Sequence, residues 1–166
     1  MSVAPSHNSL IRGTSYVTSV WATDGNGVAA THLQGAGGSA TSVRLPAGAD
    51  GAKTITWVAV DRLGNSATAT RTVIVDNTAP TVKVTKAPKN KAKLTRKVTL
   101  TVAASDRNGV ARVQLVVNGK VVATDAKAGY SFVLNPKKYG KKFTVQLRAY
   151  DRAGNVRTSG QLSYHR

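Results

Sequence analysis

Apolar and polar residues alternate along much of the chain with a period of two, which is the pattern of a strand that buries one face. Val98, Leu100 and Val102 alternate with threonines, and Val145 and Leu147 alternate with polar residues in the same way. A helix needs a period near 3.6 instead, and no segment is predicted to be helical. The alternation therefore predicts an all-β protein.

The second half of the chain carries the clearest strand pattern, with a hairpin turn predicted at Asn118-Gly119. Seven short strands within 90 residues are typical of an immunoglobulin-like β-sandwich. The predicted strands cover residues 80–86, 97–105, 111–118, 120–124, 130–134, 142–150 and 156–164.

An internal repeat organises the whole chain. Trp21-Ala-Thr-Asp-Gly-Asn-Gly-Val-Ala29 returns 82 residues later as Ala103-Ala-Ser-Asp-Arg-Asn-Gly-Val-Ala111. Thr54-Ile-Thr-Trp-Val-Ala-Val-Asp-Arg-Leu-Gly-Asn65 returns 90 residues later as Thr144-Val-Gln-Leu-Arg-Ala-Tyr-Asp-Arg-Ala-Gly-Asn155. Two matches in the same order with nearly equal shifts indicate two copies of one domain.

The boundary between the copies is predicted at Val75-Asp-Asn-Thr-Ala-Pro80, because a proline without an N–H can open a strand but not continue a ladder. The predicted fold is therefore two tandem immunoglobulin-like β-sandwiches of about seven strands each, without helices. The predicted domains are residues 1–77 and 78–166, joined end to end with little interface.

The composition supports the same fold class. All seven acidic residues are aspartate, and the chain of 166 residues contains no glutamate and no cysteine. Glutamate is a good helix former, whereas aspartate belongs to turns, where its side chain bonds the backbone two residues on. Abundant threonine and valine favour strands.

The second copy resembles the bacterial Ig-like domains in the segment from Gly109 to Asp125, in Tyr130-Ser-Phe132 and in Val145-Gln-Leu-Arg-Ala-Tyr-Asp-Arg-Ala-Gly-Asn155. The first copy is similar in its second and sixth strands and in the linker Asp76-Asn-Thr-Ala-Pro80. Such domains are commonly appended to secreted subtilisin-like peptidases, glycoside hydrolases and surface proteins, particularly in actinobacteria. The resemblance implies a non-catalytic accessory module and names no ligand.

Catalytic chemistry has few candidate residues. The only histidines are His7, His32 and His165, and none has a partner that the sequence identifies. Gly13-Thr14-Ser15 is similar to the nucleophile motif of subtilisin-like peptidases, but it leads into a strand and the accompanying Asp and His motifs are missing. Without cysteine or paired histidines, no zinc site is predicted. The chain is predicted not to be an enzyme.

Membrane and targeting signals are also missing. No stretch approaches the roughly 20 apolar residues of a membrane span. The first residues show neither a basic nor an apolar signal region, so either the protein is intracellular or a secretory signal lies outside this sequence.

The turn aspartates allow two interpretations. Each of Asp24, Asp61, Asp106 and Asp151 precedes a glycine within three residues, which is typical of a carboxylate that bonds its own turn. The alternative is calcium, which takes six to eight oxygen ligands. Sandwich topology predicts that the candidate calcium ligands meet near the linker, although arginines neighbour two of them. These ligands are Asp76, Asp106, Asp125 and Asp151.

The net charge of +17 is distributed unevenly. Residues 1–77 hold five basic and four acidic side chains, whereas residues 78–166 hold 19 basic and three acidic ones. Sandwich topology places many of these cations at the end of the second domain opposite its aspartates. This set, the cationic cap, comprises Lys89, Lys91, Lys93, Arg96, Lys97, Lys120, Lys137, Lys138, Lys141 and Lys142.

A cationic cap predicts an anionic polymer as partner, such as cell-wall teichoic acid or acidic polysaccharide. Sequence-specific nucleic acid is not predicted, because lysine is a point charge and only Tyr139 interrupts the lysines with an aromatic ring. The alternative is that the lysines only keep the surface solvated and protect edge strands. Of the two tryptophans, Trp57 lies on an inward row, whereas Trp21 points outward and is the aromatic residue to test for carbohydrate.

These observations predict a tandem accessory module of a secreted or cell-surface bacterial protein, acting as a spacer and surface-adhesion module beside a catalytic partner domain. The alternative is a structural or decoration protein of a phage virion or of an extracellular appendage. No cofactor is predicted, with calcium as the open alternative. The parent protein, the ligand and the oligomeric state do not follow from the sequence.

Overall fold

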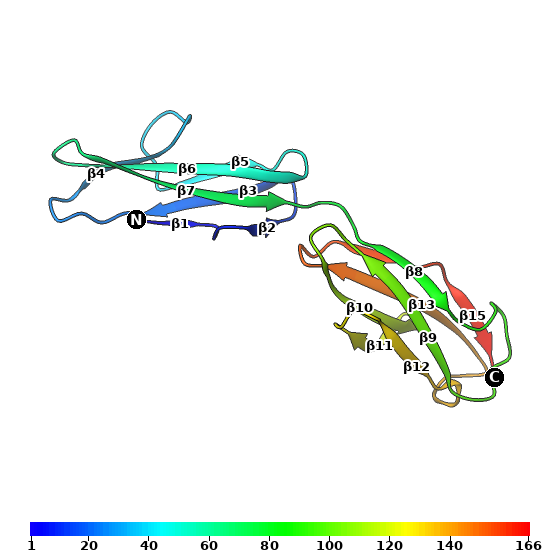
Figure 1. Cartoon of the computed structure of the whole chain (residues 1–166). Coiled ribbons are helices and arrows are strands. Elements are labelled where there is room, and N and C mark those ends of the chain that lie inside the picture. Colours follow the sequence, from blue (N-terminus) through cyan, green and yellow to red (C-terminus); the bar gives the residue numbers. More distant parts are fainter. The chain divides into compact units, whose positions relative to one another are not determined.

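The computed structural model describes residues 1–166 and is all-β (Figure 1). The chain forms two compact units, Met1–Asn77 and Thr78–Arg166. The only helical element is a single 3-10 turn, η1 (Pro136–Lys138), and no helix is long and apolar enough to cross a membrane. The predicted all-β class is confirmed.

The first unit contains seven strands in two sheets. Strand β2 (Ser9–Ile11) pairs in parallel with β7 (Ser66–Val75), whereas all other pairs in this unit are antiparallel. The N-terminal segment is divided between the two sheets at Pro5, so that its first part pairs with β3 (Ser15–Trp21) and its second part pairs with β7. One sheet has the order β1 (Ser2–Ala4), β3 (Ser15–Trp21) and β5 (Ser42–Pro46), and the other β2 (Ser9–Ile11), β7 (Ser66–Val75), β6 (Gly51–Asp61) and β4 (Val28–Leu33).

The core of the first unit is built around Trp57 on β6. Its side chain is 0% exposed, and its indole Nε1 donates a hydrogen bond to Thr18 Oγ1 over 2.9 Å. The Thr18 hydroxyl in turn donates to the carbonyl of Ala4 over 2.8 Å, which links β3 to β1. Ile55 and Val73 pack beside the indole. The predicted inward position of Trp57 is confirmed, and Trp21 faces outward as expected.

The second unit is also a two-sheet sandwich. Six of its seven predicted strands agree with the structure within two residues at either end. One sheet has the order β12 (Ser131–Leu134), β9 (Val98–Ser105) and β8 (Thr81–Lys86). The other contains β11 (Lys120–Asp125), β10 (Val110–Val117), β13 (Lys142–Asp151), β14 (Val156–Thr158) and β15 (Leu162–His165).

The final predicted strand, residues 156–164, is divided into β14 and β15, so this prediction is wrong in one detail. Both parts pair with β13, but one extra residue lies between them relative to that strand. Ser159 stands at the break, where its Oγ accepts a hydrogen bond from Leu147 N over 3.0 Å and its N–H donates to Leu147 O over 2.8 Å. The Ser159 hydroxyl thus takes the place of a backbone carbonyl in the ladder, and the extra residue opposite β13 makes this break a β-bulge.

The core of the second unit follows the alternation of its strands. Leu100, Leu115, Val145 and Leu147 are at most 1% exposed and form one cluster between the sheets. Full burial of a side chain of this size stabilises the fold by about 1.5–3 kcal/mol. The hairpin turn between β10 and β11 has positive φ at both Asn118 (48°) and Gly119 (76°), as the predicted two-residue turn requires.

Candidate polyanion-binding site

The cationic cap occupies one end of the second unit, where β8, β10, β12 and β15 end and β9, β11 and β13 begin. Its residues lie in the loop of residues 87–97, at Lys120 beside the hairpin turn, and in the segment 137–142. All ten cap side chains are exposed to solvent. The three carboxylates of this unit, Asp106, Asp125 and Asp151, stand at the other end of the strands.

An aromatic cluster anchors the cap loops to the core. Tyr139, just after η1, packs on Phe143 with ring centroids 5.4 Å apart, and Phe143 packs on Tyr164 at 6.0 Å. The hydroxyl of Tyr164 donates to the carbonyl of Pro88 over 3.0 Å. Burial also raises the pKa of Tyr164 above its ordinary value, so the hydroxyl stays protonated as a donor. Three separate cap segments therefore rest on one buried platform.

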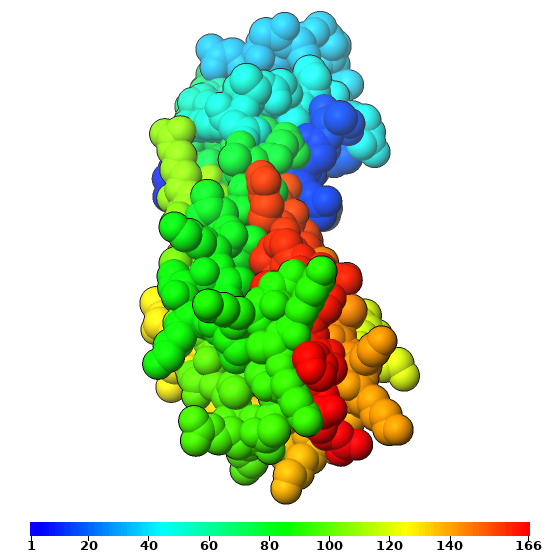
Figure 2. Space-filling view, turned by 90° about the vertical axis from the view of Figure 1, so that its right-hand side faces the viewer, coloured from blue at the N-terminus to red at the C-terminus, as the bar shows by residue number.

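Backbone hydrogen bonds hold the loop of residues 87–97 against β15. Lys91 N donates to Ser163 O over 2.7 Å, and Leu94 N donates to His165 O over 2.8 Å. On the other side of β15, Arg166 N donates to Lys141 O over 2.9 Å. Figure 2 shows the result, with the red C-terminal strand lying between green and orange segments of the second unit. The lysines of both loops therefore project from fixed backbone.

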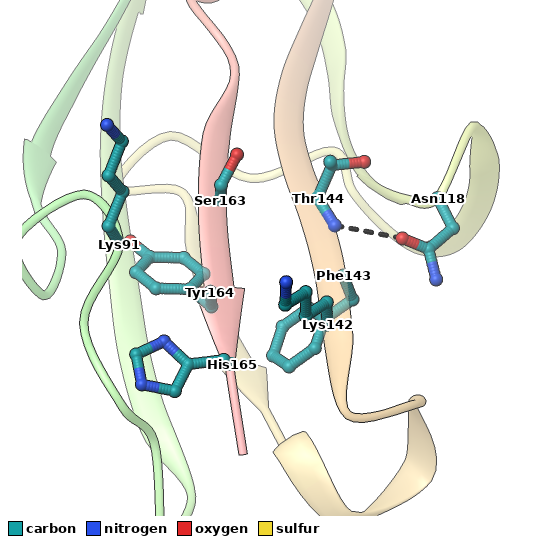
Figure 3. Close-up of a pocket in the computed structure, with 8 residues that line it drawn as sticks. All are labelled: Lys91, Asn118, Lys142, Phe143, Thr144, Ser163, Tyr164 and His165. Atoms are coloured by element: carbon teal, nitrogen blue, oxygen red, sulfur yellow. Dashed lines mark hydrogen bonds between the residues drawn. The ribbon is translucent and has the colours of Figure 1, made fainter.

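A shallow groove of about 500 Å³ lies on this surface (Figure 3). Lys142 pairs with His165 across β13 and β15, and Thr144 pairs with Ser163, so each pair lies on the same sheet face. Lys91 flanks the β15 side of the groove. The groove thus combines two ammonium groups, an imidazole and two hydroxyls, all of which can donate hydrogen bonds to an anion.

Asn118 closes the other side of the groove. Its Oδ1 accepts a hydrogen bond from Thr144 N over 2.8 Å, and its own N–H donates to Thr144 O over 3.0 Å. The hairpin that carries Lys120 is therefore tied directly to β13 (Figure 3).

Lys91 adopts an unusual backbone conformation, with φ of 67°. A non-glycine residue in this region costs roughly 1 kcal/mol or more, and such strain is concentrated at functional sites. The conformation is held by the hydrogen bond from Lys91 N to Ser163 O and by Ala92 N, which donates to Lys89 O over 3.1 Å. A long cationic side chain therefore stands at a position where glycine would fit with less strain.

Sequence reasoning missed several residues that line this groove, among them Asn118, Thr144, Ser163 and His165. The pairing of β13 with β15 brings Thr144, Ser163 and His165 together and places β15 beside the lysine loops. Because that register depends on the bulge at Ser159, the alternation pattern alone could not supply it.

The turn aspartates bond their own turns in both units. Asp24 accepts from Asn26 N over 2.8 Å, and Asp106 accepts from Asn108 N over the same distance. Asp61 accepts from Asn65 N and from the Asn65 side-chain amide, and this side-chain bond is the main reason that the pKa of Asp61 is lowered.

The repeated motif has a structural reason beyond the carboxylates. Gly27 and Gly109 occupy equivalent turns with φ of 86° and 97°. A Cβ at Gly27 would lie 3.2 Å from Arg62 Nε, and one at Gly109 would lie 3.1 Å from Arg152 Nε. In both units the backbone N–H of the arginine also donates a hydrogen bond to the carbonyl of the glycine. Within each unit, the turn that contains Asp-Arg therefore packs on the glycine of the turn that contains Asn-Gly.

The four candidate calcium ligands do not all gather. Carboxylate oxygens of Asp106 and Asp151 lie within 4.8 Å of each other. Asp125 is not part of this group, because its carboxylate accepts from Lys127 N over 3.0 Å and from Ser131 N over 3.2 Å. Asp151 accepts from Asn155 N and from the Asn155 side chain, and Asp76 is buried at the end of β7.

Two of the residues considered for catalysis, Ser15 and His7, have structural partners. Ser15 Oγ accepts a hydrogen bond from Arg44 Nη1 over 3.1 Å, and arginine is not a general base. His7 Nδ1 accepts from Thr72 N over 3.1 Å, which ties the N-terminal segment to β7. His32 lies on β4, and His165 belongs to the cationic groove.

Comparison with known proteins agrees with this architecture. Residues 80–149, which are most of the second unit, match the family model described as Bacterial Ig domain. Fibronectin(III)-like modules of Clostridium thermocellum CbhA have 23% sequence identity and a TM-score of 0.67, with 99% of this chain and 93% of that chain covered. Murine CEACAM1b has 14% identity and a TM-score of 0.50, with 98% and 96% covered.

No curated protein matches the sequence. The likenesses show an immunoglobulin-like and fibronectin-III-like fold. Domains of this kind are generally non-catalytic, and bacterial Ig domains are commonly extracellular.

Proposed function

We propose that the chain is a non-catalytic accessory module of a secreted or cell-surface bacterial protein, whose cationic cap binds an anionic polymer such as wall teichoic acid or acidic polysaccharide. One observation carries this proposal. Ten exposed basic side chains gather at one end of the second unit, while its three carboxylates are held in turns at the other end.

The charge separation creates a strong local field. The second unit carries 19 basic and three acidic side chains, against five and four in the first unit. Exposed charges interact over about 8 Å at physiological ionic strength, so a polymer with closely spaced anionic groups can engage several cap residues together. Because the loops are anchored by Tyr139, Phe143 and Tyr164, binding does not have to order them.

The chemistry of the cap favours a polymer that is recognised by charge alone. Nine of its ten cations are lysines, and lysine binds an anionic group as a point charge without the bidentate geometry of arginine. Tyr139 is half-buried against Phe143, so it offers no open ring on which nucleic-acid bases could stack.

The first unit supplies length rather than charge in this proposal. Its net charge is close to zero, and it therefore acts as a spacer between the cap and a catalytic partner domain elsewhere in the parent protein. The generally extracellular use of bacterial Ig domains supports a location outside the cell.

The test is binding of the whole chain to purified wall teichoic acid and to heparin over a series of salt concentrations. Replacing the four lysines of the segment 137–142 with glutamine should remove a large share of the binding and lower its salt dependence. These side chains are exposed, so the sandwich should stay folded. The control replaces three cations of the first unit, Arg44, Lys53 and Arg71.

Two results would contradict the proposal. If both sets of substitutions weakened binding equally per charge removed, the chain would have no localised site. If neither polymer bound at moderate salt, the lysines would serve only as a solvated surface.

A further inference from the structure

The two tryptophans of the first unit lie in opposite environments. Trp57 is 0% exposed in the core, whereas Trp21, at the end of β3, is 72% exposed. An indole that is left in water gives up the stabilisation that burial of so large an apolar side chain would provide. Packing inside this unit therefore does not account for Trp21.

The surroundings of Trp21 leave its ring accessible. Ser2 is its cross-strand partner on β1, and Ser19 precedes it on the same face of β3. Ser42, on β5, pairs with Ser19. None of these side chains is large enough to cover an indole, so the ring stands above an area of small hydroxyl residues.

A groove of about 540 Å³ lies beside this indole. No charged residue lines the groove, and its polar side chains are the hydroxyls of Thr31, Ser39 and Thr41. The groove is also structurally fixed. Thr31 Oγ1 donates to Ala40 O over 2.6 Å, and Ala40 N donates to Thr31 O over 2.7 Å, which joins the segment 39–41 to β4.

These observations argue against a peptide strand as the occupant. Strand addition needs unpaired backbone groups along an edge. On β4 the outward carbonyls of Thr31 and Leu33 already accept hydrogen bonds from Ala40 N and Ala36 N. The lack of charge argues equally against an anionic polymer at this groove.

We propose that Trp21 and the adjacent groove form a binding site for a neutral polysaccharide. The apolar C–H face of a pyranose ring would stack on the indole, and its hydroxyls would exchange hydrogen bonds with Ser39 and Thr41. This site is separate from the cationic cap in position and in chemistry, because its ligand is uncharged and its binding does not depend on salt.

The test uses the full chain at 0.5 M NaCl, where binding through the cap is screened. Mixed-linkage β-glucan, galactomannan and arabinoxylan serve as neutral probes. Binding is followed by tryptophan fluorescence and by retardation in native gels that contain the polymer. We expect at least one polymer to bind and to shift the Trp21 emission. Trp21→Ala should weaken binding about tenfold or more, and Trp21→Tyr should retain part of it.

The matched control is Leu63→Ala, which removes an apolar side chain that is 71% exposed at the β6–β7 turn and does not line the groove. It should bind as the unchanged chain does. Failure to bind all three polymers, or equal weakening by both alanine substitutions, would overturn the proposal. A dimer that dissociates on Trp21→Ala in sedimentation, without polymer binding, would identify a second copy as the occupant and would also overturn it.

Discussion

Replacement of Lys91 by glycine should weaken polymer binding without destabilising the second unit. Lys91 has φ of 67°, and relief of this strain should stabilise the fold by roughly 1–2 kcal/mol. The added freedom of glycine in the unfolded chain costs about 0.5–1 kcal/mol in return. The free energy of unfolding should therefore stay the same or rise by about 1 kcal/mol.

Lys93→Gly is the matched control, because it removes another cap charge from the same loop. Lys93 does not have a positive φ, so this variant gains no relief of strain and should lose about 0.5–1 kcal/mol. The two variants should thus differ by roughly 1–2 kcal/mol in stability. Each should lower the slope of log affinity against log salt concentration by about 0.7–0.9, which is the value for one lost charge contact.

Urea unfolding measures the stability of the two units separately. Both tryptophans lie in the first unit, so their emission should not change in either variant. Four of the five tyrosines lie in the second unit, and their near-ultraviolet circular dichroism follows its unfolding. Equal destabilisation by Lys91→Gly and Lys93→Gly would refute the idea that Lys91 is kept at a cost in stability.

Three further predictions concern the turns and the first core. Thr18→Val should lower the free energy of unfolding of the first unit by about 1–3 kcal/mol, because the buried indole N–H of Trp57 loses its acceptor. Tryptophan emission during urea unfolding measures this loss, and an unchanged unfolding midpoint would contradict the prediction. Asn65→Ala should raise the pKa of Asp61 toward its ordinary value of 3.8, as followed by carboxyl NMR. Because the pKa of Asp61 is lowered in the folded state, its contribution to stability is present above the ordinary value and is lost as the pH falls through the folded-state pKa. An unaltered titration would show that another group lowers it. Finally, melting curves in EDTA and in millimolar calcium should coincide, because the turn carboxylates already accept backbone hydrogen bonds; a clear rise in melting temperature with calcium would establish a metal site instead.

Much of this fold could be predicted because strand alternation reports burial directly. Successive side chains of a strand point to opposite faces, and counting along β3 and β6 was enough to place Trp57 inside and Trp21 outside. The order of strands in a sandwich was also enough to show which loops share an end, and hence where the lysines gather.

The remaining features depend on tertiary contacts that alternation does not encode. The division of the last strand rests on the Ser159 hydroxyl, which bonds Leu147 of another strand. The positive φ of Lys91 follows from contacts with β15 rather than from a local turn signal, because lysine has no preference for that region. The groove requires both features, so no pattern within one segment indicates it.

The most direct test of the cationic cap is a comparison of two variants that each lose four charges from the second unit. Binding to wall teichoic acid is measured against salt concentration for both variants and for the unchanged chain. One variant replaces four cap lysines with glutamine, and the other replaces four exposed cations outside the cap. The first set is Lys137, Lys138, Lys141 and Lys142, and the second is Lys83, Arg107, Lys127 and Arg157.

We expect the cap variant to lower the slope of log affinity against log salt by about 3, which corresponds to the loss of four contacts, and the other variant to leave it nearly unchanged. Equal loss of slope and affinity in the two variants would contradict a localised site and leave only the overall charge of the unit.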